Sequence, residues 1–280
     1  MLLENDTYYF KRLWKHYKYR FTPWIAYNFM KQAKKVPKNS EYNKKELCDQ
    51  LVKLLERFEW PPYEVAFCRD KNEQKIYFSK LHRHNQNIMS DVCGFELKLA
   101  PSTISGAGRG VFVKSGKIQK GQIACLYPGL VYQPWDKILL ASIKNAYIFR
   151  CSDGVMLDGK PKGLSKYLYK SIHGRDRMNG FEPICDVSWM LDDYNYHVNP
   201  LNIGQIVNNH KNGLEPPNVV YQELDIIHSE EQFSHHILPL LPNINYDFQL
   251  NHRIKLVPLV AVREINENQE LFSSYFTLID

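Results

Sequence analysis

The sequence lacks the cysteine patterns of disulfide-rich proteins and of cysteine-bound zinc proteins. Its six cysteines are scattered singly, and no two of them form a C-x-x-C pair. The histidine pairs His82 with His84 and His235 with His236 have no cysteines at ligand spacing. We therefore expect reduced thiols and no metal site in an intracellular protein of the nucleus or the cytoplasm.

Long hydrophobic runs are also missing. No apolar stretch approaches the roughly 18–20 residues that a transmembrane helix needs, and KLVPLVAV at 255–262 is short and contains a proline. The opening MLLENDTYYF does not have the basic-then-apolar order of a secretory signal. The sequence predicts no membrane span. A regular alternation of strands and helices is absent too, which disfavours a parallel doubly wound sheet.

Positive charge is concentrated at the N-terminus. Residues 1–45 hold eleven Lys and Arg against three Asp and Glu, a net of +8, whereas the whole chain carries +6. Within this segment, residues 6–22 predict a basic amphipathic helix, because apolar residues recur at helical spacing. Three interpretations stay open: the helix packs on the main domain, contacts nucleic acid or chromatin, or targets the protein to an organelle such as the mitochondrion.

A second amphipathic helix is predicted after Asn43, a suitable N-cap with Glu46 three residues later. Its apolar face consists of Leu47, Leu51, Leu54, Leu55 and Phe58, and Pro61-Pro62 ends it. A polar stretch around 71–75 and 82–87 follows, to which we assign no element. Residues 1–90 are thus predicted to form a helical, basic N-terminal region.

From about Gly94 the sequence changes to short β-type runs separated by glycine-containing turn signals. We expect strands at 95–100, 111–113, 122–127, 147–151, 155–157, 219–227 and 253–262. A short helix is expected at 137–143. Residues 91–280 therefore predict a mainly β domain that also contains α-helix, with an inserted segment at about 160–203.

The stretch GAGRGVFV at 106–113 places three glycines around one arginine, a density typical of backbone held close to another group. A dinucleotide site requires G-x-G-x-x-G at the start of a helix, but Val111 stands at the third glycine position and a β-type run follows. The Gly-Lys-Ser/Thr ending of a phosphate-binding loop is also absent. This excludes the common phosphate sites and leaves a tight turn between strands, or another ligand.

Four stretches in order resemble the SET-domain methyltransferases. They are STISGAGRGVFV (102–113), YIFRCSDGVMLDG (147–159), IGQIVNNHKNGLEPPNVVY (203–221) and REINENQELFSSYF (263–276). Each is weakly specific alone, but their order is a strong signal. The resemblance covers about residues 92–278 and implies the β-clip SET fold, in which small curved β-sheets carry a C-terminal pseudoknot. It also implies transfer of a methyl group from S-adenosylmethionine to a lysine side chain of a protein substrate.

The same resemblance implies residues for the methyl donor. The Gly-x-Gly backbone of the family holds the methionine and sulfonium end of the donor, which assigns that role to Gly108, Arg109 and Gly110. The asparagine of the family's Asn-His segment corresponds to Asn208, with Asn209 at the histidine position. Asn208 and Asn209 could instead cap a turn.

On the acceptor side, the resemblance implies that the C-terminal tyrosine, Tyr275, is catalytic and also contacts the cofactor, and that Tyr147 forms an opposite wall. A lysine amine has a pKa near 10.4, so it must lose a proton before methyl transfer, and burial beside a sulfonium cation favours that loss. A tyrosine can hydrogen-bond the amine while its ring lines an apolar channel. Glu223 and Asp225 alternate on a predicted strand, so we expect them to face solvent; the alternative is that they form an acidic rim, which would attract a basic peptide.

The sequence also departs from the family pattern. Asn209 stands where histidine is usual, although a shift of one residue would align Asn209-His210 with Asn-His. Ser274 replaces an aspartate, and Asn268-Gln269 replace Gly-Glu. These departures motivate a second hypothesis, a catalytically weak SET module that acts as a protein or chromatin binding scaffold.

Overall fold

The computed structural model describes residues 42–62, 70–134, 136, 145–167, 186, 188–210, 216–227, 237–244 and 253–274. The helices predicted at 6–22 and 137–143 lie outside these residues, as does Tyr275. Within the described ranges, none of the helices combines the length and apolar character that crossing a membrane requires. The division of the chain at residue 90 stays a prediction.

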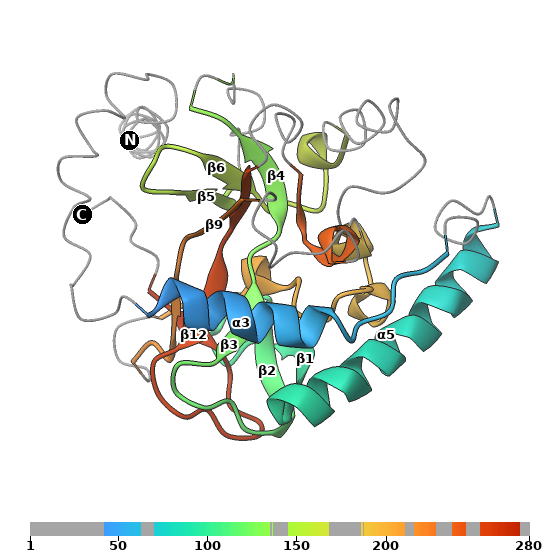
Figure 1. Ribbon diagram of the computed structural model, residues 1–280, viewed down its shortest axis with the longest axis horizontal. Coiled ribbons are helices and arrows are strands. Elements are labelled where there is room, and N and C mark those ends of the chain that lie inside the picture. The colour runs from blue at the N-terminus through green and yellow to red at the C-terminus, as the bar shows by residue number, and fades with distance from the viewer. Residues whose placement is uncertain are drawn as a thin grey trace, which may run out of the picture.

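The predicted second helix is confirmed as α3, Lys44–Leu55. Asn43 caps it through a side-chain oxygen that accepts from the Lys45 N–H, and Asn43 Nδ2 donates to Glu46. The four leucines of the predicted apolar face and Phe58 are all buried. They belong to the same hydrophobic core as the strands, and α3 lies across the front of that core (Figure 1).

The polar stretch after residue 70 forms α5, Lys71–Cys93, a helix of 23 residues that the sequence did not reveal. Its N-cap is Asp70, and Gly94 ends it with a φ of 80°. The buried face contains polar side chains: His82 Nδ1 lies 2.7 Å from the His197 carbonyl oxygen, and Asn85 Nδ2 donates to the carbonyls of Glu59 and Val198. An apolar pattern could not identify such a face, because its polar members are buried and paired with backbone.

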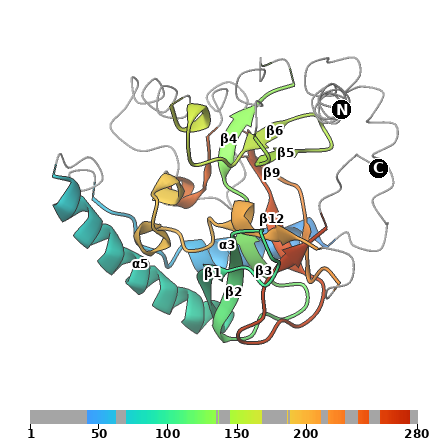
Figure 2. The same ribbon diagram turned by 180° about the vertical axis from the view of Figure 1, so that it is seen from behind.

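The described strands form several small sheets (Figures 1 and 2). The strands are β1 (Phe95–Pro101), β2 (Arg109–Gly116), β3 (Ile123–Leu126), β4 (Gly129–Tyr132), β5 (Ile148–Arg150), β6 (Met156–Asp158), β7 (Asn208–Asn209), β8 (Val219–Tyr221), β9 (Leu224–Ile227), β10 (Asn243–Ile244), β11 (Arg253–Leu256), β12 (Pro258–Ala261) and β13 (Phe272–Ser273). Short 3-10 helices are η3 (Ser188–Met190), η4 (Tyr194–Tyr196), η5 (Gly204–Ile206) and η6 (Leu238–Leu240).

The sheet orders are β1-β2, β10-β4-β6-β5, β11-β9 and β3-β12-β8-β13-β7. Two predicted strands are each split into two, because 219–227 breaks between β8 and β9 and 253–262 breaks at Val257. The breaks let consecutive residues join different sheets, so β8 and β9 belong to different sheets, as do β11 and β12. β4, β7, β10 and β13 were not predicted; β4 begins at the glycine of a Pro-Gly turn signal.

The last described strand, β13, lies between β7 and β8 and pairs in parallel with both. The chain therefore passes from one side of β13 to the other between Asn209 and Val219, and the C-terminal segment is threaded into the sheet. The third and fourth sequence stretches thus form the C-terminal pseudoknot that the resemblance implies.

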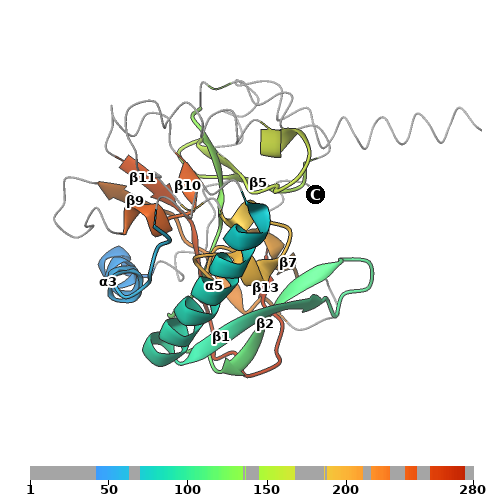
Figure 3. The same cartoon turned by 90° about the vertical axis from the view of Figure 1, so that its right-hand side faces the viewer.

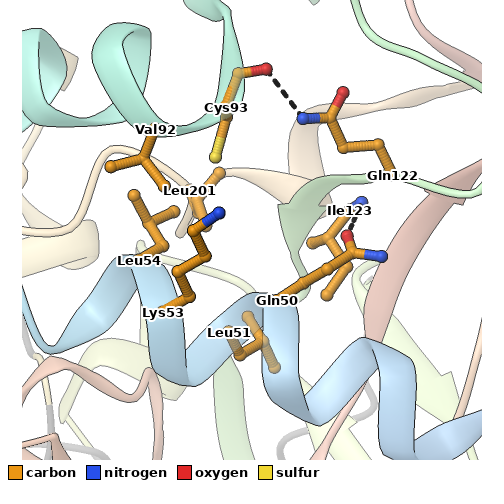
Figure 4. Close-up of a pocket in the computed structure, with 9 residues that line it drawn as sticks. All are labelled: Gln50, Leu51, Lys53, Leu54, Val92, Cys93, Gln122, Ile123 and Leu201. Atoms are coloured by element: carbon orange, nitrogen blue, oxygen red, sulfur yellow. Dashed lines mark hydrogen bonds between the residues drawn. The ribbon is translucent and has the colours of Figure 1, made fainter.

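The helices dock on the sheets through hydrogen bonds between side chains and backbone. Gln50 Oε1 accepts from the Ile123 N–H, and Gln122 Nε2 donates to the Cys93 carbonyl. Between these contacts lies a pocket of 220 Å³ (Figure 4). Its lining consists of Gln50, Leu51, Lys53, Leu54, Val92, Cys93, Gln122, Ile123 and Leu201.

Candidate functional site

Glu270 is a buried carboxylate that joins three distant parts of the chain, with only 5% of its surface exposed. Its Oε1 accepts from Ser102 Oγ at 2.7 Å and from Asn208 Nδ2 at 3.1 Å. Its Oε2 accepts from the Thr103 N–H at 2.8 Å and from Thr103 Oγ1 at 2.7 Å. We call Ser102, Thr103, Gly110, Asn208 and Glu270 the Glu270 network. It brings together the first, third and fourth stretches.

Gly110 is required by the close approach of this carboxylate. A Cβ at Gly110 would lie 2.1 Å from Glu270 Oε1 and 3.3 Å from Asn208 Nδ2, so a larger residue cannot fit unless Glu270 moves. Gly108 is a glycine for a different reason. Its φ is 80°, a conformation that L side chains rarely adopt, and a Cβ there would meet nothing within 4 Å. The backbone at Gly108 is therefore open on that side.

Asn208, rather than Asn209, lies against the glycine-rich stretch. Asn208 Nδ2 donates to the Arg109 carbonyl at 3.1 Å as well as to Glu270, whereas the Arg109 side chain is exposed. Asn209 pairs with Ser273 in the parallel β7–β13 ladder, and the His210 N–H donates to the Ser273 carbonyl. Figure 3 shows β7 and β13 together behind the β1–β2 hairpin. Asn208 thus contacts the glycine-rich stretch, and both Asn208 and Asn209 lie on the strand β7. Their roles toward the methyl donor stay predictions of the resemblance.

Asn218 holds the threaded strand in place, and it is 2% exposed. Its Nδ2 donates to the Glu270 carbonyl at 2.8 Å, its Oδ1 accepts from the Phe272 N–H at 2.8 Å, and its own N–H donates to the Phe272 carbonyl at 2.9 Å. These bonds fix the backbone on both sides of Leu271. They connect the Pro-Asn part of the third stretch to the fourth stretch.

The replacement of the family's Gly-Glu by Asn268-Gln269 leaves the turn before Glu270 intact. Asn268 has a φ of 64°, and asparagine adopts this left-handed conformation more readily than other residues with a side chain. Its N–H donates to the Val113 carbonyl, and the Gln269 carbonyl accepts from the Val113 N–H. Asn268 therefore does what a glycine would do here, and Glu270 still reaches its partners.

Three aromatic rings gather at the other end of β13. Phe149 and Tyr221 have ring centroids 4.9 Å apart, Tyr127 and Phe149 5.4 Å, and Tyr127 and Tyr221 6.1 Å. Tyr221 Oη lies 3.1 Å from Ser273 Oγ. We call these three rings the aromatic wall. It adjoins the Ser273-Ser274 segment that leads to Tyr275.

Tyr147 contributes its backbone to this arrangement. Its side chain is 40% exposed, and its carbonyl accepts from Tyr127 Oη at 2.7 Å and from the Gly159 N–H at 2.9 Å. The rings that contact one another here are those of Tyr127, Phe149 and Tyr221. The roles assigned to Tyr147 and Tyr275 stay predictions of the resemblance.

Sequence reasoning did not single out Glu270 or the three residues of the aromatic wall. Phe149 and Tyr221 both lie within stretches that carry the resemblance, so their position was available as a signal. Tyr127 was available only as the tyrosine before a Pro-Gly turn. Nothing local distinguishes Glu270 from other glutamates, because its importance comes from partners 62 and more residues away in sequence.

Glu223 and Asp225 alternate with buried residues as predicted, but they are only partly exposed and both pair with a lysine. Lys255, whose side chain is 6% exposed, lies 2.7 Å from Asp153 Oδ2, 3.3 Å from Glu223 Oε2 and 3.2 Å from Asp225 Oδ1. Glu223 and Asp225 side chains are 25% and 26% exposed. Burial alone would lower the pKa of Lys255, but the Asp153 hydrogen bond and the other carboxylates raise it overall. We call these four residues the Lys255 cluster.

In the part of the chain that the structure describes, one group of potential metal ligands comes together: Cys151, Asp153 and Glu223, with ligand atoms within 4.8 Å of one another. Two of these three residues already pair with the Lys255 ammonium. Burial raises the pKa of the Cys151 thiol, which disfavours the thiolate form that binds metals. This geometry suits an ion-pair cluster better than a metal site.

Buried titratable groups also lie along the segment that leads into η5 and Asn208. Burial lowers the pKa of His82 to about 4 and that of His197 to about 3. Burial raises the pKa of Asp186 to about 6, although Ser188 and Asn202 donate hydrogen bonds to its carboxylate. The His82 ring joins this segment to α5 through the His197 carbonyl, and Asn199 and Asn202 join it to η6 through the Leu240 carbonyl.

Comparisons with known proteins complete the description of the site. The chain is 36% identical over 299 residues to SET domain-containing protein 9 of Homo sapiens, covering 95% of this chain and 96% of the human protein. It is 41% identical over 215 residues to the Pongo abelii protein of the same name, covering 77% of this chain and 74% of that protein. A scan against protein-family models finds no match. Among solved structures, the complex of KRYPTONITE with mCHH DNA, H3(1–15) peptide and SAH matches with a TM-score of 0.33 and 17% identity, covering 65% of this chain and 23% of that one.

Proposed function

Because the chain belongs to the SET domain-containing protein 9 family, we propose that it is a protein-lysine N-methyltransferase that takes its methyl group from S-adenosylmethionine. The predicted SET fold is confirmed, with small sheets and a threaded C-terminal strand. The observation that carries the proposal is the convergence of Ser102, Gly110, Asn208 and Glu270, with the aromatic wall at the other end of the same short strand, β13.

The Glu270 network suits the methyl-donor side. When bound, S-adenosylmethionine supplies a methyl group carried on a positively charged sulfur. The space beside Gly108 lets a ligand approach the backbone, whose Gly108 and Arg109 carbonyls already accept from the Ser102 N–H and Asn208 Nδ2 and keep a second lone pair for a cation, while the exposed Arg109 guanidinium suits a carboxylate. Asn208 fixes this backbone, because its Nδ2 donates both to the Arg109 carbonyl and to the Glu270 carboxylate. Both side chains lie beside Gly110. We call this region the donor side.

The aromatic wall suits the acceptor side. A lysine has an apolar stem and a cationic end, which an aromatic channel can accommodate through its ring faces. Exclusion of water by Tyr127, Phe149 and Tyr221 favours the neutral amine that attacks the methyl group. Tyr221 Oη and Ser273 Oγ are polar groups at the edge of this wall. Holding the amine and the methyl group in line can supply about 7–11 kcal/mol of the barrier in favourable cases.

The substrate that we propose is a lysine in a protein, and the basic N-terminal segment stays a predicted nucleic-acid or chromatin contact. The first test is calorimetric titration of the full-length protein with S-adenosylhomocysteine. The second is transfer of labelled methyl from S-adenosylmethionine to a protein array. We expect binding and transfer, and we expect Tyr275→Phe to bind S-adenosylhomocysteine but to lose most of the transfer.

The scaffold hypothesis predicts a different result in the same two measurements. Binding of S-adenosylhomocysteine without transfer to any protein on the array would favour a catalytically weak module. The absence of binding at millimolar concentration would overturn the methyltransferase proposal. The intact Glu270 network and the glycine-like turn at Asn268 favour the enzyme, because the departures from the family pattern do not disturb this side of the site.

A further inference from the structure

The two rings of the aromatic wall that contact most closely come from different sheets. Phe149 is on β5, in the sheet β10-β4-β6-β5, and Tyr221 is on β8, in the sheet β3-β12-β8-β13-β7. Strand pairing within either sheet therefore does not set their separation of 4.9 Å. Contacts between the sheets must set this separation. Two members of the Lys255 cluster lie close to these strands in sequence: Asp153 follows β5, and Glu223 follows β8.

The Lys255 cluster joins the tip of the β5–β6 hairpin to the strand that follows β8. Asp153 lies at the turn between β5 and β6, and Glu223 and Asp225 follow Tyr221 by two and four residues. In Figure 1, β9 lies beside β5 and β6. Lys255 is on β11, opposite Asp225 in the β11–β9 ladder. Its ammonium therefore joins the turn between β5 and β6 to the link between β8 and β9 and to its own sheet.

Further hydrogen bonds make the hairpin tip rigid. Asp153 uses its two oxygens separately: Oδ1 accepts from the Val155 N–H within the turn, and Oδ2 accepts from Lys255 Nζ. Glu223 also uses both oxygens, accepting from the Ser152 N–H at 2.7 Å and from Ser152 Oγ at 2.9 Å. The turn is thus attached to the neighbouring sheet by one charged centre and one carboxylate clamp.

The charge of Lys255 is essential to this attachment. Three carboxylates within 3.3 Å of one point repel one another strongly when no cation lies between them. Lys255 is 5% exposed, whereas the carboxylates are a quarter to a third exposed. Removal of the cation would let the carboxylates move apart into water, and the hairpin would move away from β8 and β9 with them.

From this geometry we infer that Lys255 is a positioning residue for the acceptor channel: it fixes the β5–β6 hairpin so that Phe149 closes against Tyr221. This inference rests on the proposed function for its catalytic consequence, but its structural part does not. Lys255 touches neither the Glu270 network nor the glycine-rich stretch in any described contact. Its effect is therefore confined to the acceptor side.

The variants that test the inference are Asp153→Asn, Lys255→Met and Lys255→Arg in the full-length protein. Asp153→Asn is the mild change, because it removes one partly exposed charge and keeps a hydrogen-bonding side chain. Lys255→Arg keeps the positive charge and should restore most of what Lys255→Met loses. The matched control is Lys117→Met, which breaks an exposed ion pair with Glu264 at 3.0 Å.

The first readout is hydrogen exchange, which does not depend on activity. The reporting amides are Cys151 N–H, bonded to the Val155 carbonyl, and Gly159 N–H, bonded to the Tyr147 carbonyl. The comparison amide is Leu271 N–H, bonded to the Val111 carbonyl on the donor side. For Asp153→Asn we expect exchange about tenfold faster in 148–159 and unchanged exchange at Leu271.

The second readout separates donor from acceptor binding. For Asp153→Asn we expect the KM for the acceptor protein to rise about tenfold, with the Kd for S-adenosylhomocysteine unchanged. The inference would be overturned if the KM for the acceptor protein and the Kd for S-adenosylhomocysteine changed equally. It would also be overturned if hydrogen exchange in the hairpin did not respond to Asp153→Asn and Lys255→Met. If the wild-type protein neither binds S-adenosylhomocysteine nor transfers methyl, the proposed function fails, and hydrogen exchange alone then decides whether Lys255 holds the hairpin.

Discussion

Glu270 on the donor side and Lys255 beside the acceptor side are equally buried, at 5% exposure each, but their partners differ. Glu270 accepts four hydrogen bonds from two hydroxyls, one amide side chain and one backbone N–H. Lys255 is surrounded by three carboxylates. The donor side is thus held by directional bonds from uncharged groups, and the acceptor side by compensation between charges.

The difference has consequences for what each side tolerates. A network of directional bonds depends on the shape of the backbone around it, so it fails when a group is moved by a fraction of an ångström. A charge cluster with partly exposed members tolerates small movements but responds to loss of charge. Substitutions that change shape should therefore act mostly on the donor side.

Gly110→Ala should have the largest effect, because it adds one carbon where the donor side has no room. The new Cβ would lie 2.1 Å from Glu270 Oε1, and moving that carboxylate disturbs its bonds to Ser102 and Asn208. We expect the affinity for S-adenosylhomocysteine to fall by about 100-fold, which corresponds to about 3 kcal/mol. Calorimetric titration measures it.

The control for this change is Gly108→Ala. A Cβ at Gly108 meets nothing within 4 Å, so its cost comes only from the φ of 80°. We expect a loss of folding stability of about 1 kcal/mol and a smaller loss of affinity than for Gly110→Ala. Equal losses of affinity for the two variants would show that close packing against Glu270 is unimportant.

Asn218→Ala should have the next largest effect, since it removes the clamp on the threaded strand. The change leaves the Phe272 N–H and the Glu270 carbonyl without their side-chain partner in a buried position. We expect a loss of about 2–4 kcal/mol in the free energy of unfolding, measured by urea denaturation.

Asn218→Asp is the matched variant for the same position. It keeps the oxygen that accepts from the Phe272 N–H but places a second oxygen against the Glu270 carbonyl. It should therefore also be destabilised. A stability equal to that of the wild type for both variants would mean that β13 is held by the ladder alone.

The sequence predicted the helices and strands whose residue pattern is local. It did not predict those that depend on contacts with residues far away in the chain. α3 could be predicted because Asn43, Glu46 and a continuous leucine face lie within one segment. α5 could not, because His82 and Asn85 occupy its buried face and hydrogen-bond to backbone carbonyls more than 20 residues away. A buried polar residue looks like a surface residue until its partner is known.

The candidate site shows the same limit. Gly110 and Asn208 were predicted from the resemblance, and the structure brings them together. Glu270 and Lys255 were not predicted, since each gains its role from groups on other strands. The sequence pattern correctly predicted that Glu223 and Asp225 alternate with buried residues. It could not show that both pair with Lys255, because Lys255 is 30 or more residues further along the chain.

Acid should sharpen the comparison, because the buried groups with strongly shifted pKa values, His82, Asp186 and His197, lie on α5 and on the segment that precedes Asn208. The pKa of His82 is about 4 in the folded protein and near 6.5 when unfolded. The unfolded state therefore binds the proton more readily, and the free energy of unfolding falls as the pH drops from 6.5 towards 4. When the pH is lowered from 7 to 5, the free energy of unfolding of the wild type should fall by about 2 kcal/mol more than that of His82→Gln.

Asp186 acts in the opposite direction and has its own variant. Its folded pKa is raised to about 6, so the stability it contributes is present below its unfolded pKa of 3.8 and is lost as the pH rises through 6. Asp186→Asn should therefore lose more stability than the wild type on acidification from pH 7 to pH 5. Urea midpoints at the two pH values measure both variants. Parallel pH profiles for wild type and His82→Gln would contradict the assignment.

Tyr221→Phe should have the smallest effect and should show how far the two sides are coupled. Its hydroxyl contacts Ser273 Oγ at 3.1 Å on the same strand that begins just after Glu270, while its ring contacts Phe149 on the acceptor side. The change removes one hydrogen bond and keeps the ring, so we expect a loss of about 1 kcal/mol in unfolding free energy.

Combined with Asp153→Asn in a double-mutant cycle, Tyr221→Phe should show a coupling of about 0.5 kcal/mol or more, because both changes act on the contact between Phe149 and Tyr221. Combined with Gly110→Ala it should be additive if β13 is rigid between its two ends. Coupling to Gly110 as large as that to Asp153 would mean that the donor and acceptor sides form one network, and the contrast between them would then be lost.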